Sequence, residues 1–347
     1  MIKISDHTTE DLTALAENHY KSLILSPLLG DTGRYHPRNS LIGRISTQKA
    51  VDIAAGNHAM AGFWDYLLDN NFTNLKRVIT GKPDVLETII TEIQALCGSA
   101  FFSNDITYND ASLTANGNTV KSVFNYANYR SKRECRDNCD KLNLQYCPYC
   151  NELPIQVITQ VDPITGDQDT MALLQLDHFY PQSRHPYFGL SFFNLIPGCS
   201  QCNAQLKRDK KFARNTHFNP FEKRFDDYFF FQIDNLAPSS PADIIISFTN
   251  KTPHDSKALK DFEIMERYKH HSHQRVVFKL VRTFKNHSPK INQSIKFQIK
   301  NLFNIGESEK KVLLESSNVP MEVSEINQVQ LGKLKRDIAI QLNILRE

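Results

Sequence analysis

The chain has 347 residues and a mass of 39.8 kDa, which exceeds one ordinary domain and is long enough to bury a sizeable core. Hydrophobic residues make up 40% and charged residues 23%, a composition that excludes collagen-like, coiled-coil and wholly disordered proteins. The formal net charge of +3 excludes a protein that is basic all over, so any surface for nucleic acid must come from local clusters of Lys and Arg.

The first residues and the cysteines indicate the compartment. The start, MIKISDHTTEDL, lacks the basic stretch and apolar core of a secretion signal, and no run of about 18 apolar residues predicts a membrane span. Seven cysteines is an odd number, and two pairs have the spacing Cys-x-x-Cys, which favours metal or redox chemistry over disulfides. We therefore expect a protein of the reducing cytoplasm that does not act in a membrane.

The first part of the chain is predicted to be helical. Over residues 1–130 the apolar side chains recur mostly at helical spacing, which indicates a helical N-terminal domain. Pro83 suits the first position of a helix that Gly98 would end. Asn and Gly crowd residues 104–118, which predicts a surface loop.

The sequence pattern changes over residues 131–225, where cysteine pairs, aromatic residues and β-type segments occur. Residues 155–160 and 171–176 flank the turn-rich stretch DPITGDQ, which predicts a β-hairpin. The last region, 226–347, begins with two short β-type stretches and then returns to helical spacing. The predicted fold class is α+β, with a central mixed domain between helical N- and C-terminal regions.

Two cysteine pairs in the central region predict a zinc site. Cys147 and Cys150 form one pair, and Cys199 and Cys202 form the other. Their four thiolates can converge tetrahedrally on one Zn²⁺ at about 2.3 Å each, which is the arrangement of structural zinc sites. Such an ion would staple two segments that are distant in the sequence.

Polar residues between and after these pairs have the chemistry of phosphodiester hydrolysis. That reaction needs an activated water, a cation that absorbs charge on the phosphate, and donors that hold the backbone. His178 can deprotonate water near neutral pH, while Asp177 and Asn203 offer the oxygen ligands that Mg²⁺ prefers. Neighbours in a strand point to opposite faces, so the strand must end or bulge at Asp177 and His178. Four cations that follow can neutralise flanking phosphates: Lys207, Arg208, Lys210 and Lys211.

In their order these motifs resemble the HNH endonucleases, over roughly residues 144–222. The shared pattern is Cys-x-x-Cys, Asp-His, Asn-Leu, and a second Cys-x-x-Cys followed by Asn, with a lysine four residues on. The resemblance implies a ββα-metal core, two strands and a helix that grip one catalytic Mg²⁺ or Mn²⁺. It also implies that Asn194 positions the catalytic histidine or its loop. Asn203 stands where many members carry His, which makes this an HNN variant.

A narrower resemblance extends through LDHFYP, HPYFGLSFFNLIPGCSQCNAQLKRDK and NPF. These runs are similar to the HNH effectors of bacterial anti-phage systems of the Septu type, including retron-linked versions. That similarity implies a toxic nuclease acting on nucleic acid, with DNA favoured over structured RNA, and a partner ATPase of the ABC or SMC type.

Two other functions fit part of the sequence. Cys-Pro-Tyr-Cys is also the active-site signature of glutaredoxins, where the first thiol lies at a helix N-terminus. Here the motif precedes Asn151-Glu-Leu-Pro154 and a β-type run, and a second cysteine pair follows downstream. The other alternative is a zinc knuckle that binds nucleic acid or protein without catalysis, in which the polar residues between the pairs would be idle.

The strongest charge asymmetry of the chain lies in residues 267–306, which contain nine Lys or Arg, four His and no acidic residue. Arg275, Lys279 and Arg282 are predicted to share one helical face. That face would bind phosphates of nucleic acid, although a merely solvated face or a membrane-surface helix would have the same pattern.

Three further residues have functional and structural interpretations. Cys135 and Cys139 are four apart and can share one side of a helix, but buried cysteines are common, and we interpret both as structural. His217 precedes Asn219-Pro220, where a polar turn is favoured over a further ligand.

Overall fold

The structure is a computed structural model that describes residues 2–25, 39–161, 163–166, 168–250, 257–286 and 307–346. Helices alternate with short antiparallel sheets of two strands, so the predicted α+β class is confirmed. Within these residues no helix has the length and apolarity needed to cross a membrane. The chain divides into two compact units. We call Thr8–Asn143 with Gln156–Glu222 the N-terminal unit, and Met1–His7, Leu144–Ile155 and Lys223–Glu347 the C-terminal unit.

The N-terminal unit opens with four helices: α1 (Leu12–Ile24), α2 (Leu41–Ala54), α3 (His58–Thr80) and α4 (Pro83–Cys97). Helix α4 is the one predicted from its ends. Pro83 is its first residue, and Gly98 ends it in a backbone conformation with φ of 93° that other residues rarely adopt. Its apolar stripe, Leu86, Ile89 and Ile93, is fully buried, so burial of this stripe fixes the helix in the unit.

Residues 104–118, predicted as a surface loop, form regular structure. Strands β1 (Ser103–Asp105) and β2 (Ala111–Leu113) pair antiparallel around a turn closed by the hydrogen bond from Thr107 N to Asp110 O, 3.0 Å long. Helix α5 (Ala115–Phe124) follows, and the Thr114 side chain caps it by accepting from Gly117 N. The Asn and Gly residues thus occupy the turn and the helix start, and the loop prediction was wrong for the strands.

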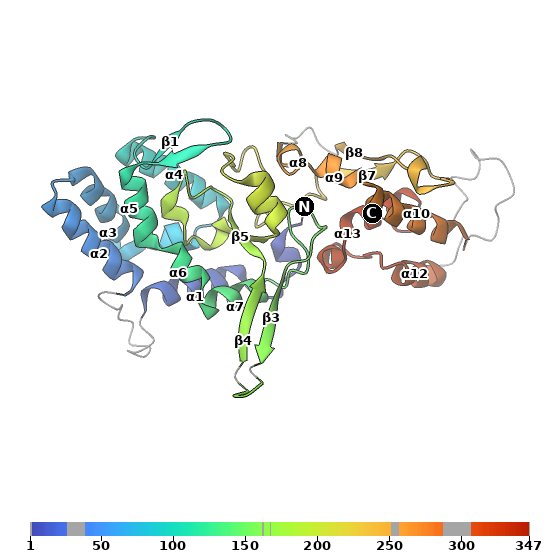
Figure 1. Cartoon of the computed structure of the whole chain (residues 1–347), viewed down its shortest axis with the longest axis horizontal. Coiled ribbons are helices and arrows are strands. Elements are labelled where there is room, and N and C mark those ends of the chain that lie inside the picture. The colour runs from blue at the N-terminus through green and yellow to red at the C-terminus, as the bar shows by residue number, and fades with distance from the viewer. Residues whose placement is uncertain are drawn as a thin grey trace. The chain divides into compact units, whose positions relative to one another are not determined.

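The central hairpin has the predicted place. After helices α6 (Tyr126–Arg130) and α7 (Arg133–Lys141), strands β3 (Gln156–Val161) and β4 (Gln168–Leu173) pair antiparallel from Gln156↔Leu173 to Val161↔Gln168. Figure 1 shows this ribbon beside α7. Arg136 of α7 binds it through Asp169 Oδ1 at 2.8 Å and Thr170 Oγ1 at 2.9 Å. The helix therefore fixes one end of the ribbon.

The last elements of the N-terminal unit are strand β5 (Gln175–His178), strand β6 (Leu195–Gly198) and helix η5 (Gln201–Lys207). Short turns η3 (Pro186–Phe188) and η4 (Phe192–Asn194) occupy the long connection between the two strands. The strands pair antiparallel, with Asp177 opposite Ile196 and His178 opposite Leu195. Strand β5 ends at His178, as expected for a strand that presents both of its last side chains to one site.

The C-terminal unit joins a hairpin to helices. Strands β7 (Phe229–Ile233) and β8 (Ile246–Asn250) pair antiparallel, and alternate residues of β7 are buried. The other elements are η1 (Ile4–Asp6), η6 (Pro241–Asp243), α8 (Lys257–Asp261), α9 (Ile264–Tyr268), α10 (His271–Asn286), α12 (Glu307–Ser316), η7 (Val323–Gln328) and α13 (Gly332–Gln341). The C-terminal third is thus mostly helical where the structure describes it, as predicted.

The units do not coincide with the three consecutive regions predicted at 1–130, 131–225 and 226–347. Long-range hydrogen bonds explain the grouping. Asn151 donates to Ile326 O and accepts from Lys333 N, which ties the segment Leu144–Ile155 to the C-terminal unit. Sequence separations above 170 residues cannot be recognised from local pattern, although the predicted boundary near 225 lies close to Lys223, where the C-terminal unit resumes.

A buried histidine joins the first helix to the connection between β5 and β6. His19 Nε2 donates to Leu190 O at 2.7 Å, and its ring lies edge-on to Tyr129 at 4.9 Å. Burial lowers the pKa of His19 from 6.5 to about 4, and the Leu190 bond offsets only part of that. The neutral ring is therefore the form that the fold accommodates.

This pKa predicts a pH-dependent stability. The folded pKa lies below the unfolded one, so the contribution of His19 is complete above about pH 6.5 and is lost as the pH falls toward 4. The loss reaches about 3 kcal/mol at pH 4. His19→Gln keeps a side-chain donor without titrating, and its free energy of unfolding should vary less between pH 6.5 and 4.5 in urea titrations. Identical pH profiles would contradict this assignment.

Candidate functional site

The residues predicted for catalysis line one cavity of about 690 Å³ in the N-terminal unit. Asp177 and His178 come from the end of β5, and Asn203 comes from η5, which follows β6. Lys207, Arg208 and Lys121 also line it. The order strand, strand, helix therefore brings Asp177 and Asn203 to one cavity, although they are 26 positions apart in the sequence.

One ring nitrogen of His178 is used in a hydrogen bond to the backbone. Its Nε2 lies 3.2 Å from Gly189 O, and because a carbonyl only accepts, Nε2 carries the proton. Nδ1 of the neutral ring then holds a lone pair. The ring also meets Tyr126 edge-on at 4.5 Å. Burial lowers the pKa of His178 to about 4, partly offset by the bond to Gly189 and by the charge of Asp177. The ring is therefore neutral at neutral pH and can accept a proton at Nδ1.

Asp177 is almost fully buried and forms an ion pair with Lys207. Lys207 Nζ lies 2.7 Å from Asp177 Oδ1, and the exposed fraction of each side chain is 1% and 2%. Nζ also donates to His178 O and lies 4.9 Å from the centre of the Phe212 ring. Burial lowers the pKa of Lys207, and Asp177 counteracts this. The ammonium holds the end of β5 through two contacts.

The predicted group of phosphate-binding cations is thus divided. Lys207 lies inside, where its charge is matched by Asp177, and this differs from the surface role expected from sequence. Arg208 is exposed and lines the cavity. Lys211 is exposed, with Nζ 2.7 Å from Asp105 Oδ2, and Lys210 is half-buried. Of the four, Arg208 has the position expected of a phosphate ligand at the site.

Asn203 offers an oxygen toward the same cavity. Its Nδ2 donates to Gln175 Oε1 at 3.1 Å, and its Oδ1 takes no part in that hydrogen bond. Asp177 and Asn203 both line the cavity and both carry side-chain oxygen atoms. Carboxylate and amide oxygens are the ligands of a hard divalent ion that keeps several waters. The two side chains have the donor types that Mg²⁺ or Mn²⁺ binds, and one of the Asp177 oxygens is already paired with Lys207 Nζ.

Asn194 braces the connection between the strands and does not bind the imidazole. Its Oδ1 accepts from Tyr180 N at 2.7 Å, and its Nδ2 donates to Tyr180 O and Phe188 O, both at 3.2 Å. Gly189, whose carbonyl accepts from His178, follows Phe188 directly. Asn194 is therefore a positioning residue that acts on His178 through one stretch of backbone.

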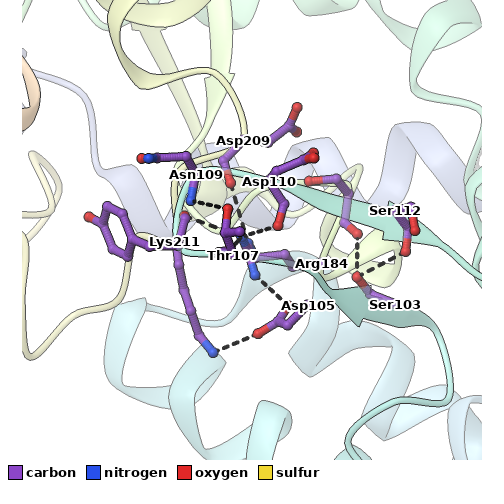
Figure 2. Close-up of polar contacts among 11 residues, drawn as sticks. Ser103, Asp105, Thr107, Asn109, Asp110, Ser112, Arg184, Asp209 and Lys211 are labelled. Carbon is purple, nitrogen blue, oxygen red and sulfur yellow. Dashed lines mark hydrogen bonds and ion pairs between the residues drawn. The ribbon is translucent and has the colours of Figure 1, made fainter.

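Arg184 joins the turn between β1 and β2 to Asp209, which lines the cavity (Figure 2). Its guanidinium is buried, forms an ion pair with Asp105, and donates to the carbonyl oxygens of Thr107, Tyr108 and Asp110 in the turn between β1 and β2. Nε donates to Asp209 O, which ties this turn to the segment after η5. Nothing in the sequence pattern marks Arg184, because its partners belong to two distant segments.

Removal of Arg184 should destabilise the site. Arg184→Ala deprives several carbonyls of their donor, at about 1 to 3 kcal/mol for each that stays shielded from water. We expect the free energy of unfolding to fall by at least about 2 kcal/mol in urea titrations. Arg184→Lys keeps the charge but has fewer hydrogen-bond donors, so it should also be less stable than wild type, by a smaller amount than the alanine variant. Equal stability of wild type and the alanine variant would show that the network is dispensable.

The two predicted cysteine pairs meet. The ligand atoms of Cys147, Cys150, Cys199 and Cys202 all lie within 4.8 Å of one another, and all four residues are buried and free of disulfides. Four sulfur atoms at this separation can hold one metal ion such as zinc. After Cys150 the chain continues through a turn to Ile155, so the helix that a glutaredoxin motif requires does not follow it.

The basic face of α10 has the predicted exposure. Arg275, Lys279 and Arg282 are exposed, whereas Val277, Leu280, Val281 and Phe284 are buried. The helix therefore presents cations on one side and packs with the other. Residues 287–306 of the predicted basic segment lie outside the described residues.

Several cavity residues escaped the sequence analysis. Lys121 of α5 and Gln182 line the cavity with His178, but neither belongs to a motif. His217, predicted as part of a polar turn, stacks on Phe212 at 3.7 Å and lies 3.1 Å from Tyr108 Oη, which agrees with a structural role. Comparison with protein-family models, curated proteins and solved structures found no match to this chain.

Proposed function

We propose that this protein is a metal-dependent endonuclease of the HNH type. The observation that carries the proposal is the cavity that His178, Asp177 and Asn203 line together at the end of a strand, strand, helix arrangement. A neutral imidazole with a lone pair beside two oxygen donors supplies a general base and a cation site, the parts that phosphodiester hydrolysis requires.

Each residue has a distinct role in the proposed reaction. His178 takes a proton from the attacking water at Nδ1, while Nε2 keeps its own proton and donates it in the hydrogen bond to Gly189 O, which keeps the ring oriented. The nearby Asp177 carboxylate favours the positive charge that the ring gains. Asp177 and Asn203 would hold Mg²⁺ or Mn²⁺, which when bound offsets charge on the phosphate and on the leaving oxygen.

The positive charge at the cavity suits a polyanionic substrate. Arg208 and Lys121 lie on the cavity wall and can contact phosphates on either side of the scissile bond. DNA is the favoured substrate and structured RNA the other. The resemblance to Septu-type effectors adds, as part of the proposal, an ATPase partner of the ABC or SMC type. Co-purification from cells that express the neighbouring genes tests that partner.

Incubation of the purified protein with DNA and with structured RNA tests the activity. Each reaction is run with Mg²⁺, with Mn²⁺ and with EDTA, and products are separated on denaturing gels. Cleavage that EDTA abolishes supports the proposal. Binding without cleavage under all metal conditions would favour the zinc-knuckle alternative, and thiol-disulfide exchange with glutathione would favour the redox one.

The exposed face of α10 is proposed as a second contact with the nucleic-acid backbone. Lys279→Glu with Arg282→Glu should weaken binding about equally for unrelated sequences, and should flatten the plot of log affinity against log salt by about 1 to 2. The matched control, Lys76→Glu with Lys82→Glu, makes the same charge change at two exposed lysines of α3 and its following turn. An unchanged slope in the α10 variant would leave a solvated helix face.

A further inference from the structure

Cys135 and Cys139, interpreted from sequence as structural, form a pair of interacting thiols. They lie one helical turn apart on α7, and both side chains are buried, with 3% and 7% of their surface exposed. Each thiol shifts the pKa of the other, downward for Cys135 and upward for Cys139. Two cysteines with a purely structural role would need only apolar neighbours. The groups around Cys135 and Cys139 therefore decide whether these thiols are reactive.

Both thiols open onto a cavity of about 300 Å³ in the N-terminal unit. Arg130 and Arg136 line the same cavity, together with Thr170 and Met171 of β4. The two cysteines are therefore buried, but a small molecule that enters the cavity can reach them. The volume exceeds that of several water molecules, each of which occupies about 30 Å³ in the liquid.

The surroundings favour a thiolate on Cys135. Arg130 and Arg136 line the cavity with Cys135 and add positive charge, and the neighbouring Cys139 thiol and Tyr129 hydroxyl also favour its charged form. Cys135 is also the third residue of α7, near the positive end of the helix dipole. These groups lower the pKa of Cys135, with Cys139 as the largest cause, while Cys135 raises the pKa of Cys139. The pair thus has one nucleophile and one proton-bearing partner.

We propose that Cys135 and Cys139 form a reactive dithiol site that a hydroperoxide oxidises through this cavity. The Cys135 thiolate attacks the peroxide, so an S–O bond forms and the O–O bond breaks. The sulfur is oxidised to sulfenic acid, and the peroxide is reduced to hydroxide or alkoxide. The Cys139 thiol then attacks this sulfur, an S–S bond forms, the S–O bond breaks, and water leaves. This inference is independent of the proposed nuclease activity.

Cys97 provides an internal reference for the first experiment. It is less buried than Cys135, but burial raises the pKa of its thiol to about 11. The zinc-loaded protein is treated at pH 7 with limiting iodoacetamide, and the labelled peptides are quantified by mass spectrometry. We expect Cys135 to react at least about tenfold faster than Cys97, because each unit of pKa changes the thiolate fraction tenfold. Equal or faster labelling of Cys97 would overturn the proposal.

The second experiment uses hydrogen peroxide as the probe. Wild type should form a disulfide between Cys135 and Cys139, detected as a linked peptide that dithiothreitol separates. In Cys139→Ser the reaction should stop at a sulfenic acid on Cys135, which dimedone traps. In Cys135→Ser, Cys139 should give no dimedone adduct, and matching melting temperatures control for the fold. Absence of both the wild-type disulfide and the dimedone adduct on Cys135 would overturn the proposal.

Discussion

Replacement of His178 by alanine is expected to lower the rate of nucleic-acid cleavage by about 10² to 10⁴, the contribution of one positioned general base. Zinc content and nucleic-acid affinity should stay close to wild type, because His178 holds neither the cysteine cluster nor a phosphate in the proposed site. His178→Gln is the sharper variant. Its amide can still donate to Gly189 O, but it has no basic nitrogen, so it should be stable and equally inactive.

Metal titration separates the base from the metal ligands. Asp177→Ala and Asn203→Ala should also lose cleavage, but through weaker binding of Mg²⁺ or Mn²⁺, so raising the metal concentration should partly restore them and should not restore His178→Ala. His185→Ala is the control, since His185 is half-buried, bonded to Tyr187 Oη and outside the cavity lining. If His178→Ala cleaves within about threefold of wild type, the base is another group.

Loss of one zinc ligand should have the largest effect on stability. The protein is expected to bind one zinc ion per chain, because four thiolates leave no open coordination position. Cys147→Ser or Cys202→Ser should weaken zinc affinity by more than about 100-fold, since even outer partners of metal ligands change it by about 10- to 100-fold. Metal binding contributes to folding, so the melting temperature should fall with the zinc content.

Atomic absorption and thermal melts of the same samples measure both quantities. Cys97→Ser is the control, because Cys97 lies at the end of α4 and does not belong to the cluster. It should keep full zinc content. A zinc-free wild type in which Cys147 and Cys150 form a disulfide that cycles with glutathione would replace the zinc assignment by the glutaredoxin alternative.

The local sequence pattern was sufficient to predict those elements whose formation depends on a few neighbouring residues. The turn-rich segment between residues 160 and 171 placed the β3–β4 hairpin, and Pro83 with Gly98 placed α4, because turn and cap preferences act over a few residues. The Cys-x-x-Cys spacing likewise identified all four cysteines of the cluster. Within 104–118 the same preferences marked the turn but missed the two short strands around it, whose pairing adds only three residues a side.

The sequence by itself determined which side chains carry the proposed chemistry, since a base, oxygen donors and thiolates are recognisable by type and order. Only the tertiary structure decided how they are used. It buried Lys207 against Asp177, made Asn194 a brace of the Phe188 and Tyr180 backbone, and surrounded Cys135 with Tyr129 and two arginines. The physical reason is that charge pairing, burial and pKa depend on neighbours brought in from distant segments, which residue type and spacing do not encode.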